Sequence, residues 1–347
     1  ADYTDAILKE IEWTAKYINS TRQVSSIFFG GGTPTSLPAE ELIKILDTCM
    51  RFFKVDPDIE ISLEANPGTV NPGYFSKVRD SGFNRVSIGA QSFISHELEL
   101  LERIHGPTAI IHTTNQAKEE GFQNISLDLM FALPNQTLDD WDYSLKQAVK
   151  LNPNHISAYN LTFEPKTAFY SYLKSGKLTP LDDDQQLTLF KHTLKKMEDS
   201  NYIQYEISNF SKLGKKCKHN INYWHNGDYI GLGAGASTFW AGIRRRNINS
   251  PSKYIEKTLK TGQAVDFVET PNIDTSIGET MMLGLRLSEG INLKQFETRY
   301  GIPLLKKFPQ QIDHLKSKNL IEIGSSNIRL SKKGFFIADS VILEFLP

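Results

Sequence analysis

Residues 26–34 read Ser-Ile-Phe-Phe-Gly-Gly-Gly-Thr-Pro, a short apolar run that ends in three glycines. A run this short, bounded by turn-forming residues, is typical of a buried strand rather than a helix. Glycines directly after a strand make a tight turn possible, and they also let the backbone approach a ligand closely. The stretch therefore predicts a core strand whose carboxyl end carries either a plain turn or a binding loop.

Further along the chain, strands and helices alternate. The apolar periodicity predicts strands at 26–29, 59–63, 85–88, 125–131, 155–161 and 203–207, and helices at 7–18, 38–53, 72–81, 94–103, 108–120, 138–149 and 183–199. Strands that recur about every 30 residues with helices between them indicate βαβ units and a parallel sheet. The series is too short for a closed eight-fold barrel. We therefore expect an α/β fold with a partial parallel (β/α)6-type barrel.

The last part of the chain has a different pattern. After about residue 270 the helices are short, and two apolar runs, 320–323 and 328–330, flank a small polar turn. That arrangement predicts a β-hairpin. Together with the short helices it suggests a small winged-helix-like α+β domain. We expect a partial barrel at 1–210, a connecting segment at 211–269 and this domain at 270–347.

Composition excludes several classes of protein. The chain has 347 residues, with 39 Lys and Arg against 40 Asp and Glu, a formal net charge of −1. Such a chain has no general field that attracts nucleic acid or anionic lipid. Apolar runs all fall short of the roughly 18 residues that span a bilayer, and the first residues lack the apolar core of a signal peptide. We expect a cytoplasmic monomer or dimer with at most peripheral membrane association.

The two cysteines are too few for a disulfide framework or a zinc ribbon. Cys49 shares an apolar helical stripe with Leu42 and Leu46, so we expect it to be a buried core thiol. Cys217 lies in a basic, polar stretch. We expect Cys217 to be an incidental surface thiol, with haem attachment as the less favoured alternative.

Polar residues recur where the predicted strands end. They are Gly31, Gly32 and Thr33 after the first strand, Glu64 and Gln91 after the next two, Asp128 within the fourth and Thr162 after the fifth. Each has a purely structural explanation, such as a turn, a cap or an ion pair. In a parallel barrel, however, the carboxyl ends of the strands meet at one mouth. Glycines and carboxylates gathered there suit a zwitterionic, ribose-bearing ligand. The spacing matches neither the dinucleotide fingerprint nor a P-loop.

Several of these motifs occur together and in order. Gly30–Pro34, Glu64–Gly68, Arg85–Ser92 and Asp128–Met130 resemble the radical S-adenosylmethionine (SAM) core of the coproporphyrinogen III oxidase family. The resemblance covers nearly the whole chain. It implies the following contacts to SAM: Gly31, Gly32, Thr33, Glu64, Gln91, Arg103, Asp128 and Thr162. In this reading Arg103 would meet the carboxylate of SAM by a charge-assisted hydrogen bond.

The chain departs from this family in one respect. The family holds a [4Fe–4S] cluster through three thiolates of a CxxxCxxC loop, with SAM on the fourth iron. That loop is absent from this chain, and Cys49 and Cys217 match none of its positions. The family places the loop a few tens of residues before the position of Ala1. Either the native protein carries the loop upstream, which we favour, or this is a member without a cluster.

A second motif lies at residues 217–225, Cys-Lys-His-Asn-Ile-Asn-Tyr-Trp-His. His219-Asn220-x-x-Tyr223-Trp224 resembles the HNxxYW motif of the HemW-type haem chaperones. The resemblance implies that His219 is an axial ligand of haem iron and that Tyr223 and Trp224 offer aromatic surface to the porphyrin. His225 is a rival ligand. The candidates for meeting the haem propionates are Lys215, Lys216, Lys218 and Arg244, Arg245 and Arg246.

The motif also has a structural reading, because a His-Asn pair often ties a loop and a Tyr-Trp pair often closes the end of a barrel. The leading functional hypothesis is a haem chaperone that delivers haem to acceptor proteins, respiratory enzymes among them. The alternative is an oxygen-independent coproporphyrinogen III oxidase, which would use SAM, the cluster and an electron donor. A third hypothesis, a nucleic-acid-binding module, is disfavoured because residues 323–329 are poor in positive charge.

Overall fold

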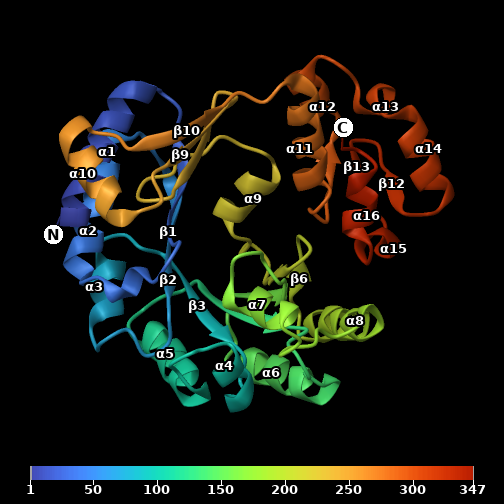
Figure 1. The fold of residues 1–347 in the computed structure, drawn as a ribbon, viewed down its shortest axis with the longest axis horizontal. Helices are drawn as coiled ribbons and strands as arrows, with labels where there is room; N and C mark the ends of the chain where they lie inside the picture. The colour runs from blue at the N-terminus through green and yellow to red at the C-terminus, as the bar shows by residue number, and fades with distance from the viewer. Residues whose placement is uncertain (1, 347) are drawn as a thin grey trace. The chain divides into compact units, whose positions relative to one another are not determined.

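The computed structural model describes residues 2–346, and its largest feature is a seven-stranded sheet (Figure 1). The strands are β1 (Val24–Phe29), β2 (Val55–Ala65), β3 (Arg85–Gln91), β4 (Ile125–Phe131), β5 (His155–Asn160), β6 (Ile203–Gln204) and β7 (Asn209–Ser211). They run in the order β1-β2-β3-β4-β5-β7-β6. Pairing is parallel from β2 to β5, whereas β7 is antiparallel to both β5 and β6. The sheet curls into a half-barrel, so the predicted fold class is confirmed.

Helices connect the parallel strands. They are α2 (Ala39–Phe52), α3 (Tyr74–Asp80), α4 (Ser95–Leu100), α5 (Pro107–Glu119), α6 (Leu138–Lys150), α7 (Ala168–Lys174) and α8 (Asp183–Asp199) (Figure 1). Helix α6 begins at the capping box that the sequence predicts. The Thr137 hydroxyl accepts a hydrogen bond from the Asp140 amide, and the Asp140 carboxylate accepts one from the Thr137 amide at 3.0 Å. The sequence did not predict α7, which has no buried residue.

The predicted strand at 203–207 is confirmed only at Ile203 and Gln204, and its predicted end is wrong. After Gln204 the chain reverses into the antiparallel strand β7. The amide of Tyr205 donates to the carbonyl of Asn209 at 3.1 Å, which closes this turn. The apolar and polar residues alternate across the reversal as they would along one strand, so periodicity alone does not reveal it.

Alternation along the parallel strands separates an apolar face from a polar one. Apolar side chains such as Val86, Ile88, Leu127 and Leu129 are fully buried. The residues between them on the same strands form a polar series: Ser62, Glu64, Arg85, Ser87, Ser126, Asp128, His155 and Ser157. Since successive side chains point to opposite faces of a strand, this polar series lines the other face of the curled sheet. Burying that many polar groups requires hydrogen bonds among them.

The chain divides into two compact units. Residues 28–39 and 60–216 form the unit that contains most of the sheet, and residues 1–27, 40–59 and 217–347 form the other. The second unit contains helix α1 (Asp2–Ile18), helix α9 (Lys218–Trp224), helix α10 (Pro251–Thr261) and a sheet of β8 (Ser237–Trp240), β9 (Ile243–Asn247) and β10 (Val265–Glu269) in the order β10-β9-β8. Cys49, on α2, is buried as predicted.

A buried carboxyl group links several of these elements. Glu10 on α1 accepts hydrogen bonds from the Tyr254 hydroxyl at 2.6 Å, the Asn247 amide at 2.6 Å and the Gly233 backbone N–H at 2.8 Å. Burial raises the pKa of Glu10, and the three hydrogen bonds oppose that rise. Glu10 thereby connects α1, α10, β9 and the glycine-rich loop at 231–235.

The C-terminal part of this unit contains α11 (Ile273–Gly284), α12 (Leu293–Tyr300), α13 (Leu304–Lys307), α14 (Pro309–Ser317), α15 (Lys332–Phe335) and α16 (Ala338–Leu343). Its sheet has the order β11-β13-β12, with β11 (Ile291–Asn292), β12 (Ile321–Ile323) and β13 (Asn327–Leu330). The antiparallel pairing of β12 with β13 confirms the predicted hairpin. Within residues 2–346, no helix is both long enough and apolar enough to cross a membrane.

We predict that Trp141→Ala lowers the free energy of unfolding by about 3–5 kcal/mol. Trp141 on α6 is fully buried, its ring packs 5.5 Å from that of Phe131, and its indole N–H donates to the Thr193 hydroxyl at 2.8 Å. Urea denaturation measures the loss. The matched control is Tyr143→Ala on the same helix, where the side chain is 49% exposed. Equal losses in the two variants would contradict the assigned packing role.

Candidate functional site

The glycine run after β1 lies beside the end of β2. The backbone N–H of Gly31 donates to the Glu64 carboxylate at 3.2 Å, and Gly31 has a φ of +81°, which favours glycine. A Cβ atom at Gly30 would lie 2.8 Å from the carboxyl carbon of Glu64. A Cβ at Gly31 or Gly32 would meet no atom within 4 Å. Gly30 therefore permits the approach of Glu64, while Gly31 and Gly32 present open backbone.

Two hydrogen bonds join the loops after β1 and β2. The side-chain amide of Asn66 donates to the Thr33 hydroxyl at 2.7 Å, and the hydroxyls of Thr35 and Thr69 lie 2.7 Å apart. Thr33, a predicted site residue, is thus held next to the strand that carries Glu64.

A β-bulge at the end of β3 aims Gln91. The register between β3 and β4 shifts between Ile88 and Gln91, and Gln91 has a φ of +64°. Bulges and left-handed non-glycine residues are concentrated at functional sites, where they redirect a side chain. A Cβ at Gly89 would lie 3.1 Å from the Gln91 amide nitrogen and 3.2 Å from the Asn66 oxygen. The side chain of Gln91 therefore lies over Gly89, close to Asn66.

Three serine hydroxyls hold the carboxylate of Asp128 on β4. Ser87 on β3 donates at 2.8 Å, Ser157 on β5 at 2.7 Å, and Ser126 on β4 at 3.2 Å. These donors come from three adjacent strands, so the half-barrel itself sets the orientation of the carboxylate.

A buried histidine extends this arrangement. The Ser126 hydroxyl lies 2.8 Å from Nδ1 of His155, and Nε2 of His155 lies 2.7 Å from the Tyr205 hydroxyl. Ser126 has one proton and donates it to Asp128, so Nδ1 must donate to Ser126 and Nε2 must accept from Tyr205. Burial lowers the pKa of His155 well below its usual value, so this imidazole is neutral.

Glu64 is the second carboxyl group of the site. Burial raises its pKa to about 7, the negative charge of Asp128 adds to the rise, and the Gly31 N–H opposes it. Near pH 7 the Glu64 carboxyl is therefore protonated about half of the time. Together with Asp128 it can accept hydrogen bonds from an ammonium group and from hydroxyl groups.

Arg103 and His105 follow α4. The Nε atom of Arg103 and the Nε2 atom of His105 are buried without a hydrogen-bond partner in the described part of the chain. His105 forms a hydrogen bond with the Ala90 backbone in the β3 bulge. Burial lowers the pKa of His105, and the positive charge of Arg103 lowers it further, whereas the hydrogen bond to Ala90 opposes the decrease. A buried guanidinium N–H without a partner fits an anionic ligand group. Thr162, by contrast, is exposed in the loop after β5.

The HNxxYW motif forms helix α9, in the other unit. His219 and Tyr223 are four residues apart and therefore share one face. Their rings meet edge to face with centroids 4.8 Å apart, and Nδ1 of His219 lies 3.1 Å from the Ser26 hydroxyl. Tyr223 in turn meets the ring of Tyr229 edge to face at 4.7 Å. Sequence reasoning missed Tyr229, which lies outside the motif.

Trp224 occupies a different side of α9. At about 100° per residue it lies about 140° round the helix from His219. Its ring packs against the Arg286 guanidinium at 5.3 Å, and its indole N–H is buried without a partner in the described residues. His225, which ends the helix, is exposed and lies 3.7 Å from the Glu289 carboxylate. Contact of Trp224 or His225 with a porphyrin remains a prediction.

The expectation of a surface thiol at Cys217 is wrong, because Cys217 is completely buried. It occupies the N-cap position of α9, where the chain turns into the helix and packs inward. The polar neighbours that suggested exposure point elsewhere: Lys218 is exposed, and its ammonium donates to the Asp58 carbonyl at 2.7 Å.

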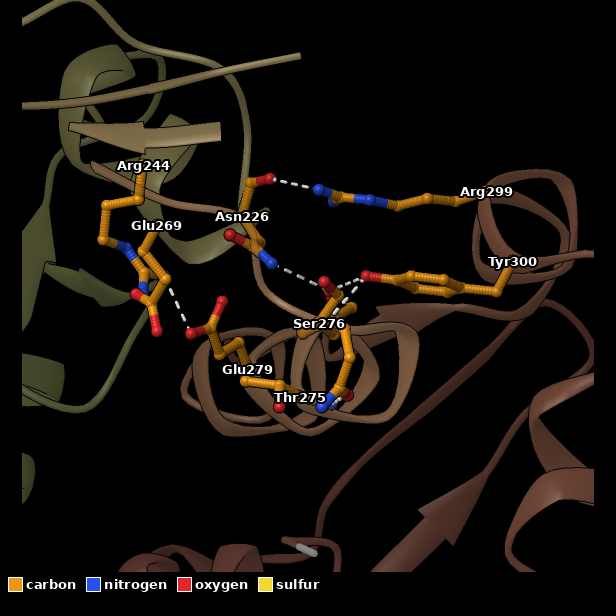
Figure 2. A network of polar contacts seen from close by, with 10 residues as sticks. Asn226, Arg244, Glu269, Thr275, Ser276, Glu279, Arg299 and Tyr300 are labelled. Atoms are coloured by element: carbon orange, nitrogen blue, oxygen red, sulfur yellow. Dashed lines mark hydrogen bonds and ion pairs between the residues drawn. The ribbon is translucent and has the colours of Figure 1, made fainter. Parts of the chain in front are cut away.

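The three arginines of β9 differ in their contacts. Arg244 forms ion pairs with Glu269 at 2.9 Å and Glu279 at 2.7 Å (Figure 2). The Arg245 guanidinium lies over the Tyr17 ring at 4.4 Å, and that of Arg246 over the Phe267 ring at 5.3 Å. Arg244 is thus already neutralised by carboxylates. Lys215 is half-buried and Lys216 is exposed.

Comparison with known proteins identifies this fold. Residues 2–148 match the radical SAM superfamily, and residues 274–337 match the HemN C-terminal domain. The solved structure of the coproporphyrinogen III oxidase HemN from Escherichia coli covers 99% of this chain and 82% of its own, with a TM-score of 0.83 at 22% identity, and so shares the fold. The half-barrel is that of a radical SAM protein.

Curated relatives define the family more closely. The chain is 37% identical over 324 residues to the heme chaperone HemW of Bacillus subtilis, covering 93% of this chain and 86% of that one. It is 34% identical to HemW of Haemophilus influenzae over 99% of this chain and 90% of that one. The chain belongs to the HemW family.

This family implies SAM and a [4Fe–4S] cluster through its radical SAM core, and haem through its chaperone members. The residues at the barrel mouth fit SAM, since open glycine backbone, two carboxyls and an orphaned guanidinium match its amino, hydroxyl and carboxylate groups. They do not fit the cluster. Both cysteines are buried, and residues 2–346 contain no group of three His, Cys, Asp or Glu side chains arranged to hold a metal ion.

We predict that Glu64→Gln changes how stability depends on pH. A carboxyl with a raised pKa contributes stability that is present below its unfolded pKa of about 4.5 and is lost as pH rises through about 7. Relative to wild type, the Gln variant should therefore gain about 3 kcal/mol between pH 4.5 and 8. Urea denaturation across this range measures the difference. The exposed Glu99→Gln is the control, and a Glu64→Gln curve parallel to wild type would refute the raised pKa.

Proposed function

We propose that this protein is a haem chaperone built on a radical SAM scaffold, which binds haem and transfers it to acceptor proteins. Membership of the HemW family supports this function. The observation that carries it in the structure is the face of α9, where His219 and Tyr223 stand in contact and Tyr229 extends the aromatic surface.

The surroundings of His219 suit an axial ligand. If Nδ1 carries the proton and donates to the Ser26 hydroxyl, the lone pair lies on Nε2, which is the atom a metal would bind. A hydrogen bond at the other ring nitrogen also fixes the orientation of the imidazole. Tyr223, 36% exposed, and the half-buried Tyr229 then provide ring surface for a flat apolar macrocycle.

We assign SAM binding to the barrel mouth. Gly31, Gly32 and Thr33 would meet the methionine end through the open backbone, and Arg103 would meet its carboxylate. Asp128, oriented by its three serines, suits the ribose hydroxyls, and Gln91 lies where it can assist. Glu64 suits the ammonium group, while Thr162 stays a weaker candidate. The chain's own residues account for binding of SAM, and we assign them no cleavage step.

The experiment that tests the function is a haem titration of the full native protein, followed by visible absorption and combined with an assay for coproporphyrinogen III decarboxylation. A saturable Soret shift near one haem per chain, without decarboxylation, supports the chaperone. SAM-dependent turnover of the porphyrinogen without haem binding would replace it with the oxidase. Delivery is then tested by mixing the haem-loaded protein with a haem-free respiratory cytochrome and following transfer of the Soret band.

We predict that His219→Ala weakens haem binding by at least about tenfold and shifts the Soret maximum, because it removes the proposed iron ligand. His225→Ala serves as the matched variant, since His225 is adjacent and more exposed. Unchanged affinity and spectrum in His219→Ala, with a loss in His225→Ala, would transfer the ligand role to His225.

We predict that Asp128→Ala weakens SAM binding, measured by calorimetry on cluster-reconstituted native protein, by about tenfold to a hundredfold, since a hydrogen-bonded carboxylate is lost. Asp139→Ala, at the start of α6, is the control. Equal affinity for SAM in wild type and Asp128→Ala would remove Asp128 from the site.

A further inference from the structure

Helix α9 is too short to be stable by itself. It has seven residues and no side-chain hydrogen bond at its N-cap. Isolated helices of fewer than about 12 residues are marginal in water even with favourable sequences. The position of its His219–Tyr223 face must therefore be set by the elements that surround it.

Arg299 on α12 binds the C-terminal end of α9. Its guanidinium donates to the carbonyl of His225 at 3.3 Å and to that of Asn226 at 2.8 Å (Figure 2). The last carbonyls of a helix have no partner within the helix, and a basic side chain there both satisfies them and suits the helix dipole. Arg299 thus supplies the hydrogen bonds that the last carbonyls of α9 lack within the helix.

Asn226 makes a second connection. Asn226 is 6% exposed, and its φ of +50° is typical of a residue that terminates a helix. Its side-chain amide donates to the Thr280 hydroxyl at 3.0 Å. Thr280 lies 2.6 Å from the Tyr300 hydroxyl, which donates to the Ser276 carbonyl at 2.9 Å (Figure 2). This hydrogen-bonded chain runs from α9 through α11 to α12.

Two further contacts join α9 and strand β9 to α11 and the residues that follow it. Arg286, just after α11, covers the ring of Trp224, the last residue of α9. Glu279 on α11 pairs with Arg244 of β9, which also pairs with Glu269 of β10. Figure 2 shows Asn226, just after α9, Arg244 of β9 and Tyr300 of α12 converging on α11. The contacts all lie within one compact unit.

We infer that helices α11 and α12 of the HemN C-terminal domain are positioning elements for the haem-binding face of α9, with Arg299 and Asn226 as the residues that transmit the effect. This inference rests on the proposed haem site. We call the hydrogen bonds that Arg299 and Asn226 make between α9, α11 and α12 the clamp. Because coupling between two sites is reciprocal, a change that weakens the clamp also weakens haem binding, and bound haem stabilises the clamp. The C-terminal domain thus has a part in haem binding without touching the haem.

The clamp is tested first without haem, by hydrogen exchange of the full-length protein. Arg299→Met keeps the side-chain length but removes the donors, and Arg299 is exposed, so the fold tolerates the change. We expect Arg299→Met to exchange faster than wild type across residues 218–228. The control Lys294→Met, which changes an exposed cation on the same helix, should exchange at the wild-type rate. Unchanged exchange in Arg299→Met overturns the clamp, whether or not α9 binds haem.

The coupling is tested by haem titration of the same proteins. We expect Arg299→Met and Thr280→Val each to raise the Kd for haem about tenfold, a usual strength of coupling. We also expect haem to slow exchange in residues 273–300 of wild type and much less in Arg299→Met. If His219→Ala weakens haem binding but Arg299→Met does not, the coupling is refuted and the haem site stands. If His219→Ala has no effect, the haem site on α9 fails, and the coupling inferred from it fails too.

Discussion

The hydrogen bonds that the Asp128 carboxylate accepts organise the interior of the barrel. A curled parallel sheet has an interior face, and here that face carries carboxyls, serines, a histidine and an arginine. Buried polar groups without partners are costly. Ser87, Ser126 and Ser157, from three strands in register, meet that demand and orient the carboxylate at the same time. His155 and Tyr205 continue the chain to the antiparallel edge of the sheet.

The same requirement accounts for the unusual backbone of the site. The Glu64 side chain can approach the loop after β1 only because residue 30 lacks a side chain, and its carboxyl accepts a hydrogen bond from the N–H of the left-handed Gly31. The bulge at the end of β3 turns Gln91 toward Asn66. The strained backbone at Gln91 persists because the hydrogen-bonded sheet around it holds it in place. The mouth is thereby organised before any ligand arrives, which lowers the cost of binding.

Helix α9 illustrates the opposite situation, in which a functional element has little stability of its own. Its aromatic and imidazole face is defined by i, i+4 spacing, but its ends are completed by groups from distant parts of the sequence. A haem chaperone has to release its cargo as well as hold it. A short helix whose position depends on a neighbouring domain suits that requirement better than a helix buried in a rigid core.

The strand ends, the glycine run, the capping box at Thr137 and the C-terminal hairpin could all be predicted from sequence, because each depends on local periodicity and turn chemistry. The turn at 205–209, the burial of Cys217 and the roles of His105, His155 and Tyr229 could not, since each is decided by residues far away in the chain. Local sequence therefore specifies the alternation of strands and helices and carries the family motifs. Which polar side chains meet is set by the folded chain, because hydrogen bonds across strands depend on register and curvature rather than on spacing along the chain.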